Sequence, residues 1–450
     1  MNDNFLIHGD LIVEGFNDLR IDVLKIQQQI NEHAILTLKG VVNNEQGEEI
    51  LSKIDIYKPI KITKQGKELF NGIITHSIAT ECRKVCHVEI TALSHTFKMD
   101  IELKSKSFQD KSMPYENLVS EIIANYPRGA CIDKITDGAV IEKPIIQYEE
   151  TDWQFLKRIA SHFNTSLVPN ITGEGPRFFL GLPELKKGEL ISHIYTQKRD
   201  FELYKRLLPE TDLSPFDCTH YEVTTYELYE LGDRVIFDSK PLYIIKMVYQ
   251  YENSVIHNRL TLSTKAGAGQ LYGPNNNISG NSIFGKVLDT ARDHLKIHLE
   301  IDESQDIGTA YWYPYATMYA SKGETGWYFM PEIGDTVRLY HPENEEERAM
   351  AINSLKPHDP KEDVEKLDPE HRMYNPDIKY MRTEFGKEFQ FRPDGIDIIA
   401  EDDKVFITLN DDGTVYLNSD DKISFTAKED INIKAKNIND RSNRSYFNKI

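Results

Sequence analysis

Residues 407–438 read ITLNDDGT, VYLNSDDK, ISFTAKED and INIKAKNI when this stretch is divided into segments of eight residues. Each segment has an apolar residue at its first and third positions, and mostly polar or turn-forming residues close it. The eight apolar residues are Ile407, Leu409, Val415, Leu417, Ile423, Phe425, Ile431 and Ile433. A strand of about five residues with a short turn buries too little apolar surface to offset its ordering entropy. The segments must therefore stack.

The short repeat favours stacking between chains. A conventional single-chain solenoid needs several strands per coil, which eight residues cannot supply. Three chains that wind together can each lend one strand to each face of a triangular prism, with the apolar residues meeting on the axis and no open lateral edges. We therefore expect a trimeric triangular β-prism (β-helix) needle over residues 381–440. A β-meander of one chain remains the alternative.

A small β domain is expected before the needle, at residues 283–355. The run HLKIHLEI at 294–301 alternates apolar and polar residues, as a half-buried strand does. A turn is expected at Pro331, Gly334 and Asp335, directly before another alternating run. Five or so short strands in this length are typical of an OB-fold barrel.

The first 264 residues predict β barrels together with two helices, one near 114–126 and one near 151–163. The second helix has the clearer signal, because Thr151 and Gln154 have the spacing of a capping box. The expected fold class is therefore mainly β with a minor α/β part. In order, the expected segments are 1–100, a β domain; 101–185, an α/β insertion; 186–264, a second β domain; 265–282, a linker; 283–355, the OB-fold domain; 356–380, a linker; 381–440, the needle; and 441–450, the tip.

Composition limits the possible partners and compartments. The chain has 53 Lys and Arg residues against 72 Asp and Glu residues, and its formal net charge of −19 repels phosphate backbones. We therefore expect no nucleic acid partner. Four cysteines fit a reducing compartment. The N-terminus has neither a basic region nor a long apolar run, so we expect synthesis in the cytoplasm without a signal peptide.

These features, in this order, resemble the VgrG-like and phage late-control protein D family of tail hub and spike proteins. The stretch 147–160 is similar to the family's hub helix motif, and residues 331–337 are similar to the turn of its OB domain. The hub helix motif consists of Tyr148, Thr151, Asp152, Trp153, Phe155, Leu156 and Arg158. The octapeptide needle follows in the expected place, so the resemblance spans nearly the whole chain.

The resemblance implies a homotrimer whose N-terminal part closes the end of an inner tube and contacts baseplate proteins. The needle would be the membrane-puncturing spike of a contractile, phage-tail-like particle or type VI secretion-like apparatus that acts extracellularly on a target cell envelope. Some relatives have iron-bound tips built from histidines. No histidine follows His371 in this chain, so we expect no metal there and a tip finished by packing or by a separate capping protein.

Catalytic and cofactor-binding residues are not expected, and the protein is not expected to be an enzyme. Glu149, Glu150 and Asp152 resemble a glycosidase pair only superficially, since acidic residues also favour a helix N-terminus. A cell-wall hydrolase hub and a trimeric receptor-binding fibre remain the alternative functions.

No metal site is expected either. Cys82 and Cys86 share a face of an expected strand, but His87 points away, and no second pair of ligands lies nearby in the sequence. Two buried thiols explain these cysteines better.

Overall fold

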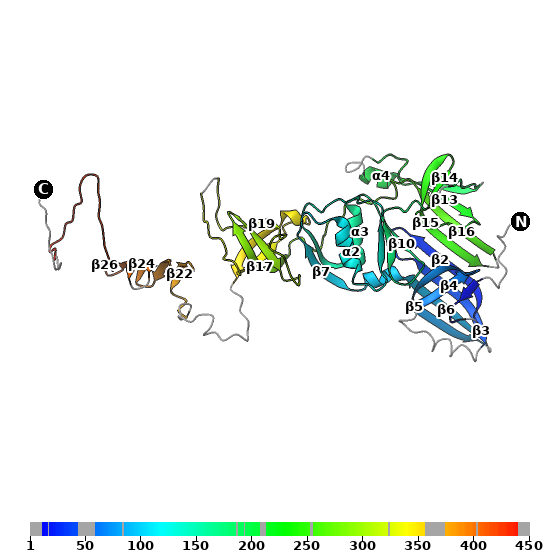
Figure 1. Ribbon diagram of the computed structural model, residues 1–450, viewed down its shortest axis with the longest axis horizontal. Helices are drawn as coiled ribbons and strands as arrows, with labels where there is room; N and C mark the ends of the chain where they lie inside the picture. Colours follow the sequence, from blue (N-terminus) through cyan, green and yellow to red (C-terminus); the bar gives the residue numbers. More distant parts are fainter. Residues whose placement is uncertain are drawn as a thin grey trace. The chain divides into compact units, whose positions relative to one another are not determined.

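The computed structural model describes residues 11–43, 59–355 and 374–439, apart from residues 17, 83–84, 186–187, 193, 208–212, 253–254, 323–324 and 402–403. The chain forms two compact units, Met1–Lys356 and Pro357–Ile450 (Figure 1). The expected tip, residues 441–450, lies outside the described residues.

A sheet of eleven strands forms the base of the larger unit. Its order is β1 (Leu11–Val13), β4 (Pro59–Lys64), β5 (Lys67–Cys82), β6 (Val85–Ser94), β3 (Ile35–Asn43), β2 (Arg20–Gln29), β15 (Lys240–Glu252), β16 (Val255–Ser263), β13 (Thr219–Thr225) and β12 (Tyr195–Arg199), while β14 (Arg234–Phe237) pairs with β15. The central pair, β2 and β15, is antiparallel and joins segments more than two hundred residues apart. The two N-terminal β regions therefore contribute to one sheet.

The expectation of closed β barrels in this region is wrong. In the part of the chain that the structure describes, the sheet is open, with β1 and β12 at its edges. Alternation in the sequence shows which face of a strand is buried, but it does not specify whether the two edge strands pair with each other.

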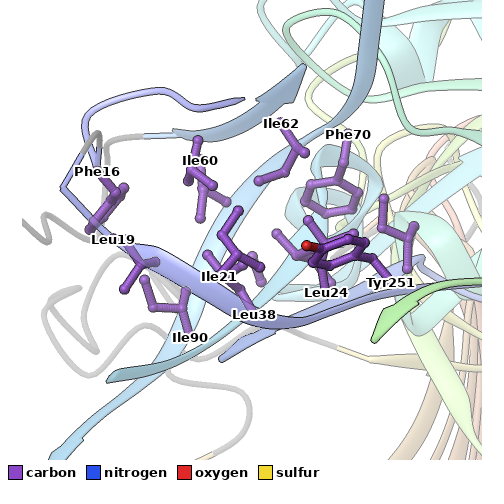
Figure 2. Packing of buried hydrophobic residues seen from close by; sticks show 14 of the residues in the cluster. Phe16, Leu19, Ile21, Leu24, Leu38, Ile60, Ile62, Phe70, Ile90 and Tyr251 are labelled. Atoms are coloured by element: carbon purple, nitrogen blue, oxygen red, sulfur yellow. The ribbon is translucent and has the colours of Figure 1, made fainter. Parts of the chain in front are cut away.

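The first half of the sheet curls around an apolar core (Figure 2). Leu24 on β2, Leu38 on β3, Ile62 on β4, Phe70 on β5 and Ile90 on β6 are completely buried in it. Each such side chain stabilises the fold by about 1.5–3 kcal/mol. Because five strands contribute to one core, it holds the N-terminal segments together as a unit.

An α/β insertion lies between the two halves of the sheet in sequence. It contains η1 (His95–Asp100), β7 (Leu103–Phe108), α2 (Tyr115–Ile123), β8 (Ala130–Asp133), β9 (Ile145–Thr151), α3 (Asp152–Ser161), β10 (Leu167–Asn170) and β11 (Arg177–Leu180). Its strands pair as β7 with β9 and as β10, β11 and β8. Leu118 of α2 and Leu156 of α3 pack with Phe178 in its core.

A third helix, α4 (Phe201–Leu207), follows β12, whereas the sequence pattern predicts only two helices. Seven residues give too few turns for a clear periodic pattern. None of the described helices is long and apolar enough to cross a membrane.

The OB domain follows as a five-stranded sheet in the order β19 (Trp312–Pro314), β18 (His294–Leu299), β17 (Ser282–Ala291), β20 (Thr336–Tyr340) and β21 (Met350–Leu355). A short helix, η2 (Glu346–Arg348), precedes β21. One bridge between Tyr315 and Ala351 connects the two edges without a continuous ladder, so the barrel is not closed. Leu295, Ile297 and Tyr313 are completely buried in its core.

The smaller unit is a five-stranded antiparallel meander of β22 (Lys379–Arg382), β23 (Glu388–Arg392), β24 (Gly395–Glu401), β25 (Val405–Asn410) and β26 (Val415–Ser419). A single chain thus adopts the alternative to the prism over these residues, because its strands satisfy their backbone groups with one another. Residues 420–439 contain no strand in one chain, although the repeat predicts strands there. The prism of three chains remains a prediction.

Candidate functional site

The capping box predicted from the sequence is confirmed at the start of α3. Thr151 Oγ1 accepts from the backbone N–H of Gln154 at 3.1 Å, and the Gln154 side chain accepts from the backbone N–H of Thr151 at 3.2 Å. Both bonds satisfy donors that a helix terminus leaves free. The indole N–H of Trp153 donates to the carbonyl of Asn31 at 3.1 Å, which connects the helix to the turn that follows β2.

Asp152 is a buried anchor, because each of its carboxylate oxygens accepts hydrogen bonds. The ammonium of Lys104 and the hydroxyl of Tyr126 each donate to Oδ2 at 2.6 Å, and the amide of Gln147 donates to Oδ1 at 2.9 Å. Burial and the bond to Asp152 raise the pKa of Tyr126. A carboxylate that is inaccessible to solvent and held by three donors is suited to fixing the helix, and not to attacking a substrate.

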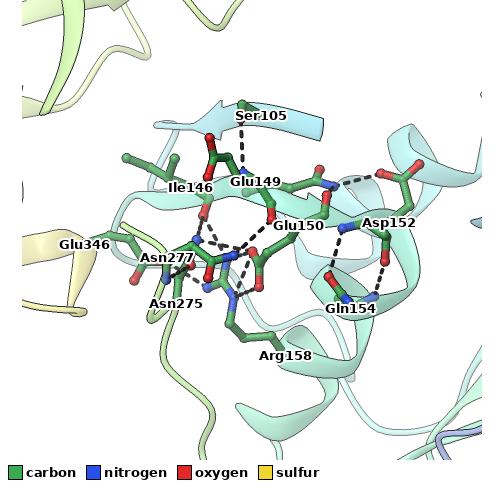
Figure 3. A network of polar contacts seen from close by, with 12 residues as sticks. Ser105, Ile146, Glu149, Glu150, Asp152, Gln154, Arg158, Asn275, Asn277 and Glu346 are labelled. Atoms are coloured by element: carbon green, nitrogen blue, oxygen red, sulfur yellow. Dashed lines mark hydrogen bonds and ion pairs between the residues drawn. The ribbon is translucent and has the colours of Figure 1, made fainter. Parts of the chain in front are cut away.

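Arg158 lies one turn before the end of α3 and forms a buried ion triad with Glu150 and Glu346 (Figure 3). Its Nη2 is 2.8 Å from Glu150 Oε2, and its Nη1 is 2.7 Å from Glu346 Oε1. All three side chains are at most 10% exposed. Burial opposes the charge on Arg158, but the two carboxylates outweigh it and raise the pKa of the guanidinium.

This ion triad joins the insertion to the OB domain. Glu150 lies near the end of β9 in the insertion, and Glu346 lies on η2 in the OB domain. Further hydrogen bonds cross the same junction. Ser107 donates to the carboxylate of Asp302 through its backbone N–H at 2.7 Å and its hydroxyl at 2.5 Å. Ile146 of β9 is completely buried in the core of the OB domain. The contacts indicate a rigid junction.

His162, directly after α3, adds a pH-sensitive group to this junction. Its Nδ1 is 3.0 Å from the Tyr115 hydroxyl, and its ring stacks on Tyr272 with centroids 5.1 Å apart. Burial, with the positive charges of Arg158 and Lys143, lowers the pKa of His162 to about 3.

Acidification should therefore destabilise this unit. An unfolded histidine takes up a proton below pH 6.5, whereas the folded one stays neutral until about pH 3. The contribution is complete above pH 6.5 and is lost as the pH falls. We expect a loss of about 1.6 kcal/mol in unfolding free energy between pH 6.5 and 5. Denaturant unfolding at several pH values tests this, and His162→Gln should show a shallower dependence; identical slopes would contradict the assignment.

The remaining residues of the predicted hub helix motif serve in packing. Trp153, Phe155 and Leu156 are buried in the core of the insertion, while Tyr148 packs against the core of the OB domain. Their role as a hub helix motif stays a prediction. The sequence could not indicate Glu346, because the partner of Arg158 lies 188 residues away.

The predicted turn of the OB domain is present between β19 and β20. Gly334 has a φ of 94°, a backbone angle that residues with a side chain rarely adopt. Its N–H donates to the carbonyl of Val287 at 2.8 Å. The carboxylate of Asp335 accepts from the backbone N–H of Glu332 at 3.0 Å, and Pro331 is buried at the start of the turn. The turn therefore supports strand pairing in the OB domain.

An uncovered apolar face lies on the meander of the smaller unit. The strand register places Phe389, Ile398, Ile407 and Leu417 in one row and Phe391, Ile396, Leu409 and Val415 in the next. Directly opposed residues of a sheet point to the same side, so these eight side chains share a face. We call it the needle face.

All eight residues that the repeat predicts as the core are exposed in one chain. The exposed fractions run from 37% for Ile407 to 72% for Ile433. A cavity of about 510 Å³ beside the needle face is lined by Leu417, Ile423 and Phe425 among others. Contiguous exposed apolar surface of this kind marks an interaction site.

The cysteine pair considered in the sequence analysis is split between two strands. Cys82 ends β5 and Cys86 lies on β6, where Cys82 is opposite Val85 and not on the strand of Cys86. The placement on one strand was wrong, because Cys82 and Cys86 belong to the neighbouring strands β5 and β6. Cys86 is buried. The described residues contain no group of three side chains suited to bind a metal ion.

A match to a protein family covers the OB domain alone. Residues 284–355 match the family described as the type VI secretion system/phage-baseplate injector OB domain. A comparison with curated proteins gives no match.

Solved structures are similar over a larger part of the chain. The Escherichia coli c3393 protein, described as a type VI secretion system component similar to the T4 bacteriophage tail proteins gp27 and gp5, has a TM-score of 0.56 and 12% identity, and the match covers 77% of this chain and 99% of that one. The half-lidded PdpA-VgrG complex of Francisella has a TM-score of 0.55 and 9% identity, covering 89% of this chain and 84% of its own. At such identities the likeness establishes the fold.

Proposed function

Because the chain has the fold of the VgrG-like tail hub and spike proteins and contains the OB domain of phage-baseplate injectors, we propose that it connects an inner tube and baseplate to a membrane-puncturing spike. The larger unit is the hub, and the smaller unit supplies the spike. The single observation that carries this proposal is the family match of the OB domain. It carries the proposal because the parts of the chain before and after this domain also resemble the solved structures described above.

Several buried contacts in the larger unit support the rigidity that such a role requires. The Arg158 ion triad, the Ser107 and Asp302 bonds and the buried Ile146 join the insertion to the OB domain. A spike that transmits force to an envelope must not yield where it meets the tube. The buried triad therefore supports a load-transmitting role for this junction.

The needle face supports a homotrimer as the working form. Uncovered isoleucine, leucine, valine and phenylalanine side chains on one face are stabilised when copies of the chain bury them together. In a trimer the strands would pair between chains, and residues 420–439 would gain the partners that one chain cannot offer. Inner tube and baseplate proteins are the other proposed partners, with a separate protein capping the tip.

Electron microscopy of the native particle tests the proposed role. Particles decorated with an antibody against the OB domain should carry the label at one end of the tube, beneath the contracted or extended sheath. Label along the sheath or on lateral fibres would contradict the proposal and would favour the receptor-binding fibre.

We expect no hydrolytic activity on cell wall. Asp152 is held by three donors, and Arg158 binds Glu150. His33 contacts Asp100 at 3.2 Å and Thr96 at 2.9 Å, an arrangement that resembles a catalytic triad of nucleophile, base and acid. Thr96 is completely buried, however, so a substrate could not reach its hydroxyl. Zymography on peptidoglycan with lysozyme as the positive control measures the activity. A cleared band that disappears when one carboxylate is replaced would favour the hydrolase hub instead.

A further inference from the structure

A cavity of about 320 Å³ lies against the central strands of the hub sheet. Its floor includes Gln28 on β2, Met247 and Tyr249 on β15 and Asn258 on β16. These positions are neighbours in the register, where Gln28 is opposite Met247 and Tyr249 is opposite Asn258. Segments of the insertion around β10 and β11 form a wall. The cavity is thus built where both halves of the sheet meet the insertion.

Gln28 is the polar group that opens into this cavity. Its side chain is 5% exposed and lines the cavity. An amide in such a place is stabilised when its N–H and C=O groups have hydrogen-bond partners. Both groups can therefore bind a molecule that enters the cavity from outside the chain.

Two polar atoms beside it have no hydrogen-bond partner within the described residues. They are the hydroxyl of Tyr249, whose residue is 4% exposed, and Oδ1 of Asn258, whose residue is completely buried. The amide nitrogen of Asn258 donates to the carbonyl of Glu227, which fixes the orientation of this side chain. All three groups are uncharged, so the floor offers hydrogen bonds without a net charge.

The charged residues at the cavity are neutralised by each other. Glu68 lies 3.8 Å from the ammonium of Lys61, and its carboxylate accepts from the backbone N–H of Gly173. Glu230 lies 3.9 Å from the ammonium of Lys67. The apolar side chains of Val168 and Phe179 line the space between. An ionic ligand would find no unpaired counter-ion here, whereas a neutral one with an apolar body fits.

From these groups we infer that the cavity binds a small neutral carboxamide, with the amide of the ligand paired to the amide of Gln28 and its apolar part against Met247 and Phe179. A carboxamide offers both a donor and an acceptor, which can pair with the C=O and N–H groups of the Gln28 side chain. The volume is at the lower end of that of small-molecule sites, which favours a compact ligand. The inference is independent of the proposed function, since it needs neither trimer nor particle.

Benzamide binding to the full-length protein, measured by ligand-observed NMR titration, tests this site. We expect saturable binding with a dissociation constant of about 1 mM or tighter, as its small size allows. Methyl benzoate, which has the same ring but no N–H donor, should bind at least about fivefold more weakly, because one hydrogen bond to Gln28 is lost.

Gln28→Leu should weaken benzamide binding at least about fivefold, while Gln27→Leu on the other face of the same strand should leave it unchanged. Leucine fills a volume similar to that of the glutamine side chain, so Gln28→Leu should unfold close to the wild-type temperature. Absence of saturable binding to the wild type, or equal binding by Gln28→Leu, would overturn the inference. Marked destabilisation by Gln28→Leu would do so too, because it would reveal a structural partner for the amide.

Discussion

Replacing Ile423 and Phe425 together by aspartate should dissociate the trimer and lower its melting temperature strongly. In one chain these side chains are 48% and 64% exposed. In the proposed trimer they lie on a dry axis, where the two substitutions would place six carboxylates around one line. Each lost apolar side chain removes about 1.5–3 kcal/mol of burial, and unpaired buried charges add to the loss. Thermal unfolding and light scattering of the purified variant measure the effect.

Ser424 and Thr426 provide the matched control for this pair. They alternate with Ile423 and Phe425 along the chain, so in a strand they point to the opposite, outer face. Ser424→Asp with Thr426→Asp introduces the same number of charges and should change little. Equal tolerance of both double variants would refute the predicted prism.

Replacing Arg158 by methionine should destabilise the hub by about 3–5 kcal/mol, the usual result when one partner of a buried ion pair is removed. Glu150 and Glu346 would remain as two buried carboxylates without a counter-ion. Because protonation removes their charges, the variant should recover part of its stability at acidic pH. Denaturant unfolding at neutral and acidic pH measures both effects.

Arg348 is the control for Arg158. It pairs with Glu343 and Glu345 at 3.1 and 3.0 Å on the same domain, but its side chain is exposed. Arg348→Met should therefore leave stability nearly unchanged, as surface ion pairs contribute little. If Arg158→Met behaved like Arg348→Met, the ion triad would not be what holds the OB domain to the insertion.

Local patterns in the sequence predicted the local features of this protein. The capping box of α3 and the turn at Gly334 involve residues within a few positions of each other. The alternation of the repeat likewise predicted which side chains share a face, and the register of β24, β25 and β26 places them so. The resemblance to VgrG-like proteins, based on the order of such features, is confirmed at the level of the fold.

Features that depend on distant residues could not be predicted in this way. The pairing of β2 with β15 and the bond between Arg158 and Glu346 join residues far apart in the sequence, and no short pattern specifies them. The open sheet replaced the expected barrels for the same reason. Residues 420–439 contain no strand in one chain, and under the proposed function their strands would form only between copies of the chain.

The mass of the purified full-length protein in solution tests the central claim most directly. Light scattering coupled to size-exclusion chromatography should give three times the chain mass of 52.0 kDa, because the proposed trimer would bury the needle face and the repeat residues that are exposed in one chain. A mass of 52.0 kDa, unchanged as the protein concentration is raised, would contradict the account of this chain as a trimeric hub and spike.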